Sequence, residues 1–143
     1  MSEGAAGGEA EIRGGCMCGA VRYAASGQPL HTGYCHCRSC RHHSGAAVAG
    51  MLVFERRNVR ITGALRLYPS SPGVQRGFCG ACGTSLSWQH ESLISLHIGT
   101  LDDPDAHPPT LHWRWEERSP WIGHADTLPH ARMVYPDPDQ DPT

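Results

Sequence analysis

All seven cysteines of this chain fall in three short clusters, and no other feature constrains its fold as strongly. The clusters are Cys16-Met-Cys18, Cys35-His-Cys-Arg-Ser-Cys40 and Cys79-Gly-Ala-Cys82. In an extended segment alternate side chains share a face, so C-x-C brings two sulfurs together, and C-x-x-C in a turn does the same. Cysteines that only fill a core have no reason to adopt these spacings. The pattern therefore predicts metal binding.

Zinc is the ion that such thiolates favour, usually as a tetrahedron of four ligands. The first and last clusters together offer a closed, structural four-thiolate site: Cys16, Cys18, Cys79 and Cys82. The middle cluster then offers three sulfurs to a second ion and leaves one position free, as in catalytic zinc sites: Cys35, Cys37 and Cys40. The sequence thus predicts two zinc ions per chain.

Two alternatives bear on these sites. His42 or His43 has the spacing to close the second tetrahedron, which would make that zinc structural as well. Cys79 and Cys82 also match a redox pair, but such a pair should open a helix, whereas residues 83–88 are typical of a turn and a strand. His36 lies between two ligands and should face the opposite side, as a residue behind the ligands or at the surface.

The composition explains why a metal would be needed. Leu, Ile, Val and Phe make up about 16% of the 143 residues, below the roughly 20% at which disorder becomes a realistic interpretation, although the net charge is only −2. Lysine is absent, which excludes Schiff-base chemistry and a phosphate-loop lysine. Scattered arginines and a slightly negative net charge also argue against a nucleic-acid-binding face.

Short segments in which apolar and polar residues alternate, bounded by Gly, Pro or Ser, predict an all-β domain. The expected strands are residues 18–25, 46–54, 58–62, 65–68, 85–88 and 93–98. Short helical turns are expected after Cys40 and at Pro104 to Ala106. Tryptophans 88, 113, 115 and 121 should supply core area, with Trp113 and Trp115 on one strand face.

The chain is expected to form one domain, residues 12–134, between disordered tails at 1–11 and 135–143. It contains no apolar run of the length of a membrane span, and its first residues lack the pattern of a signal peptide. We therefore expect a cytoplasmic protein without a membrane partner, in a reducing compartment where clustered cysteines bind metal more often than they form disulfides.

An open site of three thiolates favours a further thiol over water as its partner, because zinc with three thiolates is a weaker Lewis acid than zinc with three imidazoles. The anionic centre needs donors around it, and the nearest in sequence are His36, Arg38, Arg41 and His42.

At these residues the sequence resembles the glutathione-dependent formaldehyde-activating enzyme family, which is often grouped with centromere protein V. The resemblance rests on Gly15-Cys-Met-Cys-Gly-Ala-Val-Arg-Tyr23, Cys35-His-Cys-Arg-Ser-Cys-Arg41 with Ser44-Gly-Ala46, and Phe78-Cys-Gly-Ala-Cys-Gly-Thr84 with Leu86, and weaker likeness continues from His112 to Pro129. It implies a β-rich, Mss4-like fold of small twisted antiparallel sheets joined by zinc, and the two zinc sites assigned above.

The resemblance also implies the reaction, in which glutathione adds to formaldehyde, classed as a carbon–sulfur lyase activity in reverse. We expect a small thiol such as glutathione and an aldehyde to combine or separate at Cys35, Cys37 and Cys40, with His36 or Arg38 stabilising the developing alkoxide. The alternative is a non-catalytic zinc module that binds a protein partner.

Overall fold

The computed structural model describes residues 10–128, which form two β-sheets with little helix. The predicted C-terminal tail and most of the predicted N-terminal tail lie outside this range, and the first strand begins at Glu11. The predicted β-rich fold class is confirmed. No helix within residues 10–128 is long and apolar enough to cross a membrane.

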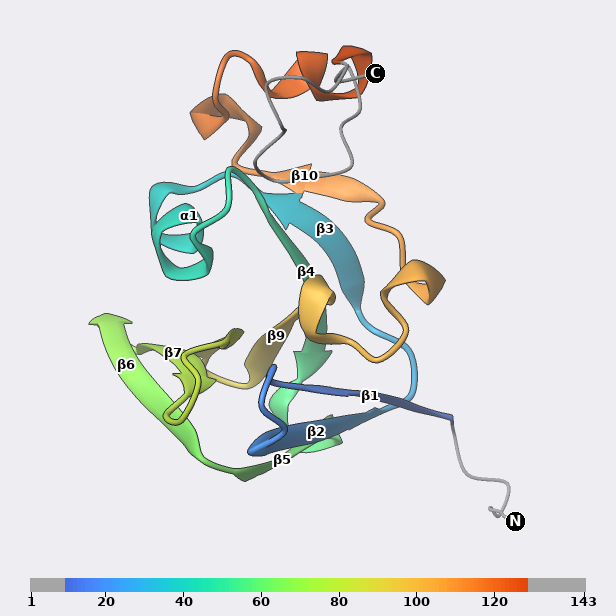
Figure 1. Cartoon of the computed structure of the whole chain (residues 1–143), viewed down its shortest axis with the longest axis vertical. Helices are drawn as coiled ribbons and strands as arrows, with labels where there is room; N and C mark the ends of the chain where they lie inside the picture. The colour runs from blue at the N-terminus through green and yellow to red at the C-terminus, as the bar shows by residue number, and fades with distance from the viewer. Residues whose placement is uncertain (1–9, 129–143) are drawn as a thin grey trace, which may run out of the picture.

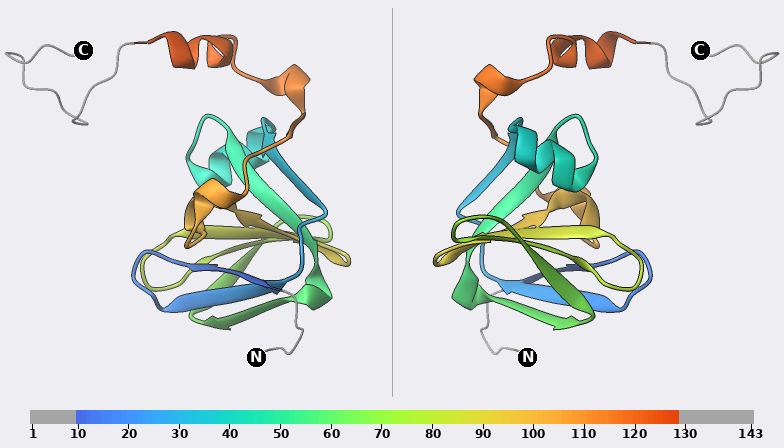
Figure 2. Two further views of the ribbon diagram at one scale, coloured as in Figure 1. Left: turned by 90° about the vertical axis from the view of Figure 1, so that its right-hand side faces the viewer. Right: turned by 90° about the vertical axis from the view of Figure 1, so that its left-hand side faces the viewer.

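The smaller sheet is antiparallel and has the strand order β1 (Glu11–Gly15), β2 (Val21–Ser26), β5 (Val59–Gly63). The larger sheet has the order β10 (Leu111–Trp113), β3 (His31–Cys35), β4 (Ala49–Glu55), β9 (Leu93–His97), β8 (Ser85–His90), β7 (Val74–Cys79), β6 (Leu65–Ser71). Its neighbours are antiparallel except β10, which runs parallel to β3. Figure 2 shows the two sheets stacked as layers.

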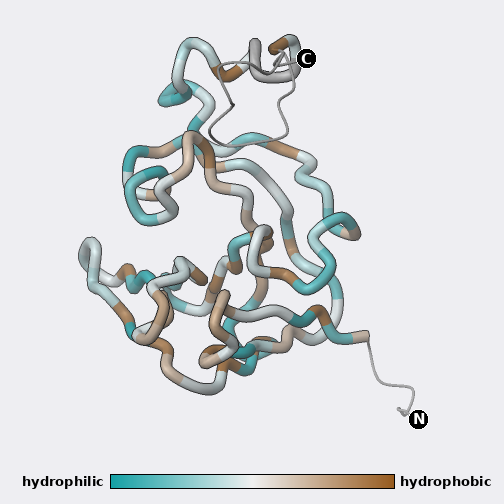
Figure 3. The backbone as a smooth tube through the Cα atoms, viewed as in Figure 1, coloured by the Kyte–Doolittle hydropathy of each residue, from teal (hydrophilic) through white to brown (hydrophobic). Residues whose placement is uncertain are grey.

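The one α-helix among residues 10–128, α1 (Arg38–Ser44), begins before Cys40 rather than after it. Five short 3-10 helices follow: η1 (Arg56–Asn58), η2 (Ile98–Thr100), η3 (Pro104–Ala106), η4 (Trp115–Glu117) and η5 (Ile122–Thr127). The predicted turn at Pro104 to Ala106 is confirmed as η3. The tube of Figure 3 is mostly hydrophilic along α1, which lies at one end of the larger sheet (Figure 1).

The main core lies between the two sheets. In β2 the side chains of Val21, Tyr23 and Ala25 are buried and alternate with more exposed residues, as expected for a strand with one face in a core. From the larger sheet, alternate residues of β4 and β9 such as Leu52 and Ile94 pack against the same cluster. Because alternation assigns these residues to one face, their neighbours Met51, Val53, Leu93 and Ser95 belong to the opposite face.

The C-terminal strand β10 differs from its prediction. Trp113 lies in β10, but Trp115 begins η4, so the two do not share a strand face. Trp115 and Trp121 are 44% and 57% exposed, and the expectation that all four tryptophans are core residues is wrong for these two. Trp113 packs so closely on β3 that a Cβ at Gly33 would lie 2.7 Å from its ring.

Candidate metal centres and the adjoining pocket

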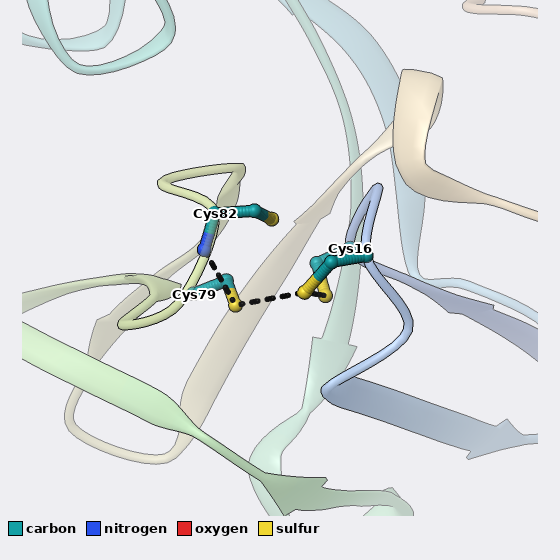
Figure 4. Close-up of side chains that lie close together, drawn as sticks. Cys16, Cys79 and Cys82 are labelled. Carbon is teal, nitrogen blue, oxygen red and sulfur yellow. Dashed lines mark hydrogen bonds between the residues drawn. The ribbon is translucent and has the colours of Figure 1, made fainter.

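The first and last cysteine clusters meet in space as predicted. Cys16 and Cys18 lie in the turn between β1 and β2, Cys79 ends β7, and Cys82 lies in the turn before β8. Figure 4 shows Cys16, Cys79 and Cys82 pointing toward one another from the two sheets. All four sulfurs lie within 4.8 Å of one another.

The spacing of these sulfurs fits a tetrahedral ion. Four sulfurs at ~2.3 Å from a central zinc would lie about 3.8 Å apart. The Sγ of Cys18 is 3.6 Å from that of Cys16 and 3.8 Å from that of Cys79. None of the seven cysteines forms a disulfide. The donor set is therefore compatible with a closed zinc site that joins the two sheets.

Backbone amides support negative charge on this cluster. The N–H of Val21 donates to the Sγ of Cys16 at 3.2 Å, and the N–H groups of Ala81 and Cys82 donate to the Sγ of Cys79 at 3.3 and 3.4 Å. The hydroxyl of Thr84 is the main group that lowers the pKa of Cys82 to about 5. Such donors are typical of a thiolate site rather than of thiols that fill a core.

The second cluster forms where β3 passes into α1. Cys35 ends β3, Cys37 is the N-cap of α1, and Cys40 lies in its first turn, with all three sulfurs within 4.8 Å. The N–H of Cys40 donates to the Sγ of Cys37 at 3.3 Å. Neither His42 nor His43 belongs to the group, and the ring of His43 instead packs against His97. Among the side chains that the structure describes, those of residues 10–123, 127 and 128, this cluster therefore offers three ligands.

The buried arginine Arg76, on β7, is a site residue that the sequence analysis missed. Its side chain is 6% exposed, its Nη1 donates to the Sγ of Cys40 at 3.5 Å, and its Nε donates to the Oγ of Ser70 at 3.0 Å. It has no carboxylate partner among residues 10–123, 127 and 128. A buried cation needs a compensating charge, and here thiolates are the nearby anions. Only the strand register brings Arg76 to Cys40.

The neighbouring thiol and Arg76 act together on Cys40. A hydrogen bond from Cys35 is the largest cause that lowers the pKa of Cys40, to about 5, and Arg76 lowers it further against the opposing effect of burial. Cys40 is therefore the natural thiolate of this cluster at neutral pH.

His36 is placed differently from its neighbours on either side. It is fully buried, its Nε2 lies 2.8 Å from the Nδ1 of His112, and its ring packs edge-on against Trp115. The backbone N–H of His36 also donates to the carbonyl of Trp113 at 3.0 Å. The expectation that it faces away from the ligands agrees with these contacts, but it is not a surface residue. It anchors the cysteine loop to β10.

A cavity of about 600 Å³ opens beside the three-cysteine cluster. Cys35, Cys37 and Cys40 line it together with Arg38 and Arg76, whereas His36 does not. The register pairs Val53 with Ser95, Ser95 with Trp88, and Trp88 with Arg76, so one row of side chains crosses four strands on this face. The cavity thus lies on the face of the larger sheet opposite the main core.

Burial of His97 predicts a pH-dependent loss of stability. Burial, together with His43 and Arg76, lowers its pKa from 6.5 to about 4. As the pH falls through 6.5 the unfolded chain gains a proton that the folded chain does not accept until about pH 4, so stability decreases across that range. At pH 5 we expect the free energy of unfolding to have fallen by about 2 kcal/mol from this residue.

The measurement is urea unfolding of the parent protein and of His97→Leu at pH 7 and pH 5. Metal release at low pH affects both proteins alike, so the difference between their pH dependences isolates His97. Equal losses of stability in the two proteins would contradict the assignment.

A solved structure of another protein has a similar architecture. The chain resembles a solved crystal structure of a Rhodobacter sphaeroides protein with a TM-score of 0.54 and 23% identity, over 71% of this chain and 98% of that chain. This is a likeness of fold. A comparison with curated proteins found no match.

The match to a family model is more specific than this likeness of fold. The model described as glutathione-dependent formaldehyde-activating enzyme matches residues 11–117, a range that contains every cysteine and Arg76. With both cysteine clusters assembled within that range, the chain belongs to the glutathione-dependent formaldehyde-activating enzyme family.

Proposed function

We propose that this protein is a zinc-dependent carbon–sulfur lyase that forms or cleaves the adduct of a small, glutathione-like thiol and an aldehyde. The observation that carries the proposal is a set of three sulfurs in the wall of a cavity of about 600 Å³, without a fourth ligand among residues 10–123, 127 and 128. Pockets of ~300–1,000 Å³ enclose ligands of this size class. The family to which the chain belongs supports the same reaction.

Each cluster would hold one zinc ion. Cys16, Cys18, Cys79 and Cys82 form the closed set. Cys35, Cys37 and Cys40 form the open one. When bound there, zinc would supply a soft Lewis acid that favours sulfur and lowers the pKa of a thiol. Free thiols of this kind persist in a reducing compartment, so we place the protein in the cytoplasm.

The reaction requires a donor for the carbonyl oxygen. In the adduct-forming direction a C–S bond forms, the carbonyl π bond opens, and the oxygen takes the proton that the thiol gives up. Arg76 suits the oxygen because its Nη2 makes no hydrogen bond to residues 10–123, 127 and 128 and the residue lines the cavity. Arg38 lines the same cavity. Since His36 does not line the cavity, we assign it to positioning the loop rather than to the alkoxide.

X-ray absorption of the zinc-loaded protein tests this function. Without thiol, one site with four sulfurs and one with three give an average of about 3.5 sulfurs per zinc, and adding glutathione should raise the average to about 4. S-methylglutathione, which cannot form a thiolate, should leave it unchanged. A shell of three sulfurs and one histidine nitrogen at the second site, unaltered by glutathione, would instead favour a non-catalytic module that binds a protein partner.

A further inference from the structure

The two sides of the cavity beside the three-cysteine cluster differ in chemistry. The side formed by the sheet is largely apolar, and β10 adds one tryptophan to it; its apolar residues are Met51, Val53, Val74, Trp88, Leu93 and Trp113. The polar residues that the sheet contributes, apart from Arg76, are His31, Ser71 and Ser95. The charged residues of the lining, apart from Arg76, come from the start of α1 and from the segment around η4. A substrate in this cavity therefore meets apolar and charged surfaces on different sides.

The charged side fits the ends of a small peptide thiol. Arg38 and Arg114 match carboxylates, and Glu117 matches an ammonium group. The Oε1 of Glu117 accepts a hydrogen bond from the backbone N–H of Arg38 at 3.3 Å, which holds these groups close together. This leaves the apolar side without a counterpart in a charged thiol.

A one-carbon aldehyde does not account for the apolar side either. Formaldehyde has two heavy atoms and no hydrocarbon body, so it fills little of a cavity of about 600 Å³. Met51 and Val53 are 5% and 9% exposed, so this wall is built into the fold and is not a loose surface patch. Apolar walls stabilise bound ligands in proportion to the apolar area that the ligand buries.

We propose that the aldehyde used by this protein carries an apolar body, aromatic or branched, that lies against the sheet side of the cavity. This inference rests on the proposed function. Arg76 and Trp88 are register partners on adjacent strands, so a carbonyl oxygen at Arg76 places the rest of the aldehyde over Trp88 and toward Val74. The thiol sulfur bonds to the carbonyl carbon, and the thiol proton ends on the oxygen, so no redox partner is needed.

The test compares phenylacetaldehyde with formaldehyde, each with glutathione and the zinc-loaded protein. Exchange NMR gives kcat/KM for adduct formation, which is divided by the uncatalysed rate constant for the same aldehyde. One methylene in an apolar pocket is worth about tenfold or more in kcat/KM. We expect the normalised value for phenylacetaldehyde to exceed that for formaldehyde at least about 100-fold.

A matched pair of variants assigns the preference to this wall. Leu93→Ser shortens a wall residue and should reduce the preference for phenylacetaldehyde over formaldehyde about tenfold. Leu67→Ser alters an exposed leucine of β6 outside the cavity and should change neither rate. Equal or greater acceleration of formaldehyde would overturn the inference and leave the proposed function standing. If neither aldehyde is accelerated, the proposed function fails and the inference fails with it.

Discussion

Replacing Cys79 with serine is expected to abolish cooperative thermal unfolding and to lower bound zinc from two ions per chain to one. Cys79 is 1% exposed and lies in both the four-cysteine cluster and the main core. Structural zinc contributes apparent binding energies of about 10–16 kcal/mol, as much as the whole net stability of ordinary domains. Since this chain has few large aliphatic residues, its two sheets should separate when the site is lost. Calorimetry and metal analysis measure both effects.

Two variants serve as controls for that experiment. Met17 lies between two of the ligands but is 92% exposed, so Met17→Ser should retain the transition and both ions. Cys37→Ser should lose the second ion and the activity while keeping most of the thermal stability, because Cys37 belongs only to the open cluster. If Cys79→Ser melts like the parent protein, the first cluster is not structural.

Replacing Arg76 with methionine is expected to lower kcat by about 100- to 1,000-fold, the usual effect of removing one donor to a developing oxyanion. KM should change little, because the charged ends of the thiol meet other groups. Arg76 forms no ion pair with a carboxylate among residues 10–123, 127 and 128, but its Nη1 donates to the Sγ of Cys40, so methionine removes a partner of the thiolates. The melting temperature should nevertheless stay near that of the parent protein, because the three-cysteine cluster is not the one that joins the two sheets. Steady-state kinetics of adduct formation and calorimetry provide these values.

The matched control is Arg66→Met, which removes an exposed arginine of β6 that does not line the cavity and should leave kcat unchanged. Arg76→Lys keeps the positive charge but loses the planar donor pair, so its kcat should fall between those of the parent and Arg76→Met. A parental kcat in Arg76→Met with intact zinc content would exclude Arg76 as the oxyanion donor.

The cysteine sites were predictable because their information is local. The C-x-C and C-x-x-C spacings bring together the sulfurs within each cluster whatever the rest of the chain does. The division into a group of four and a group of three follows from the number of cysteines and the four ligands that zinc prefers. The same holds for strands with strong alternation, such as the one around Tyr23 and the one around Ile94. Strands with little apolar content were missed, among them β1, in which Ile12 is the only large apolar residue.

The residues around the second cluster were not predictable, because pairing between strands that are far apart in the sequence brings them to it. Arg76 reaches Cys40 from 36 positions away through the register of the larger sheet. His112 lies beside His36 because β10 pairs in parallel with β3. No local sequence pattern predicts that pairing. The exposure of Trp115 follows from the same segment, since the chain leaves the sheet directly after Trp113.

The late return of β10 has a consequence for how the protein is made. The anchor between His36 and His112 spans 76 residues, so at about 5–20 residues per second the ribosome adds β10 about 4–15 seconds after the cysteine loop. During that interval the loop lacks the strand that later covers His36 and contributes Trp113 to the cavity wall. The cell must therefore keep three neighbouring thiols reduced on an unfinished chain until β10 is in place.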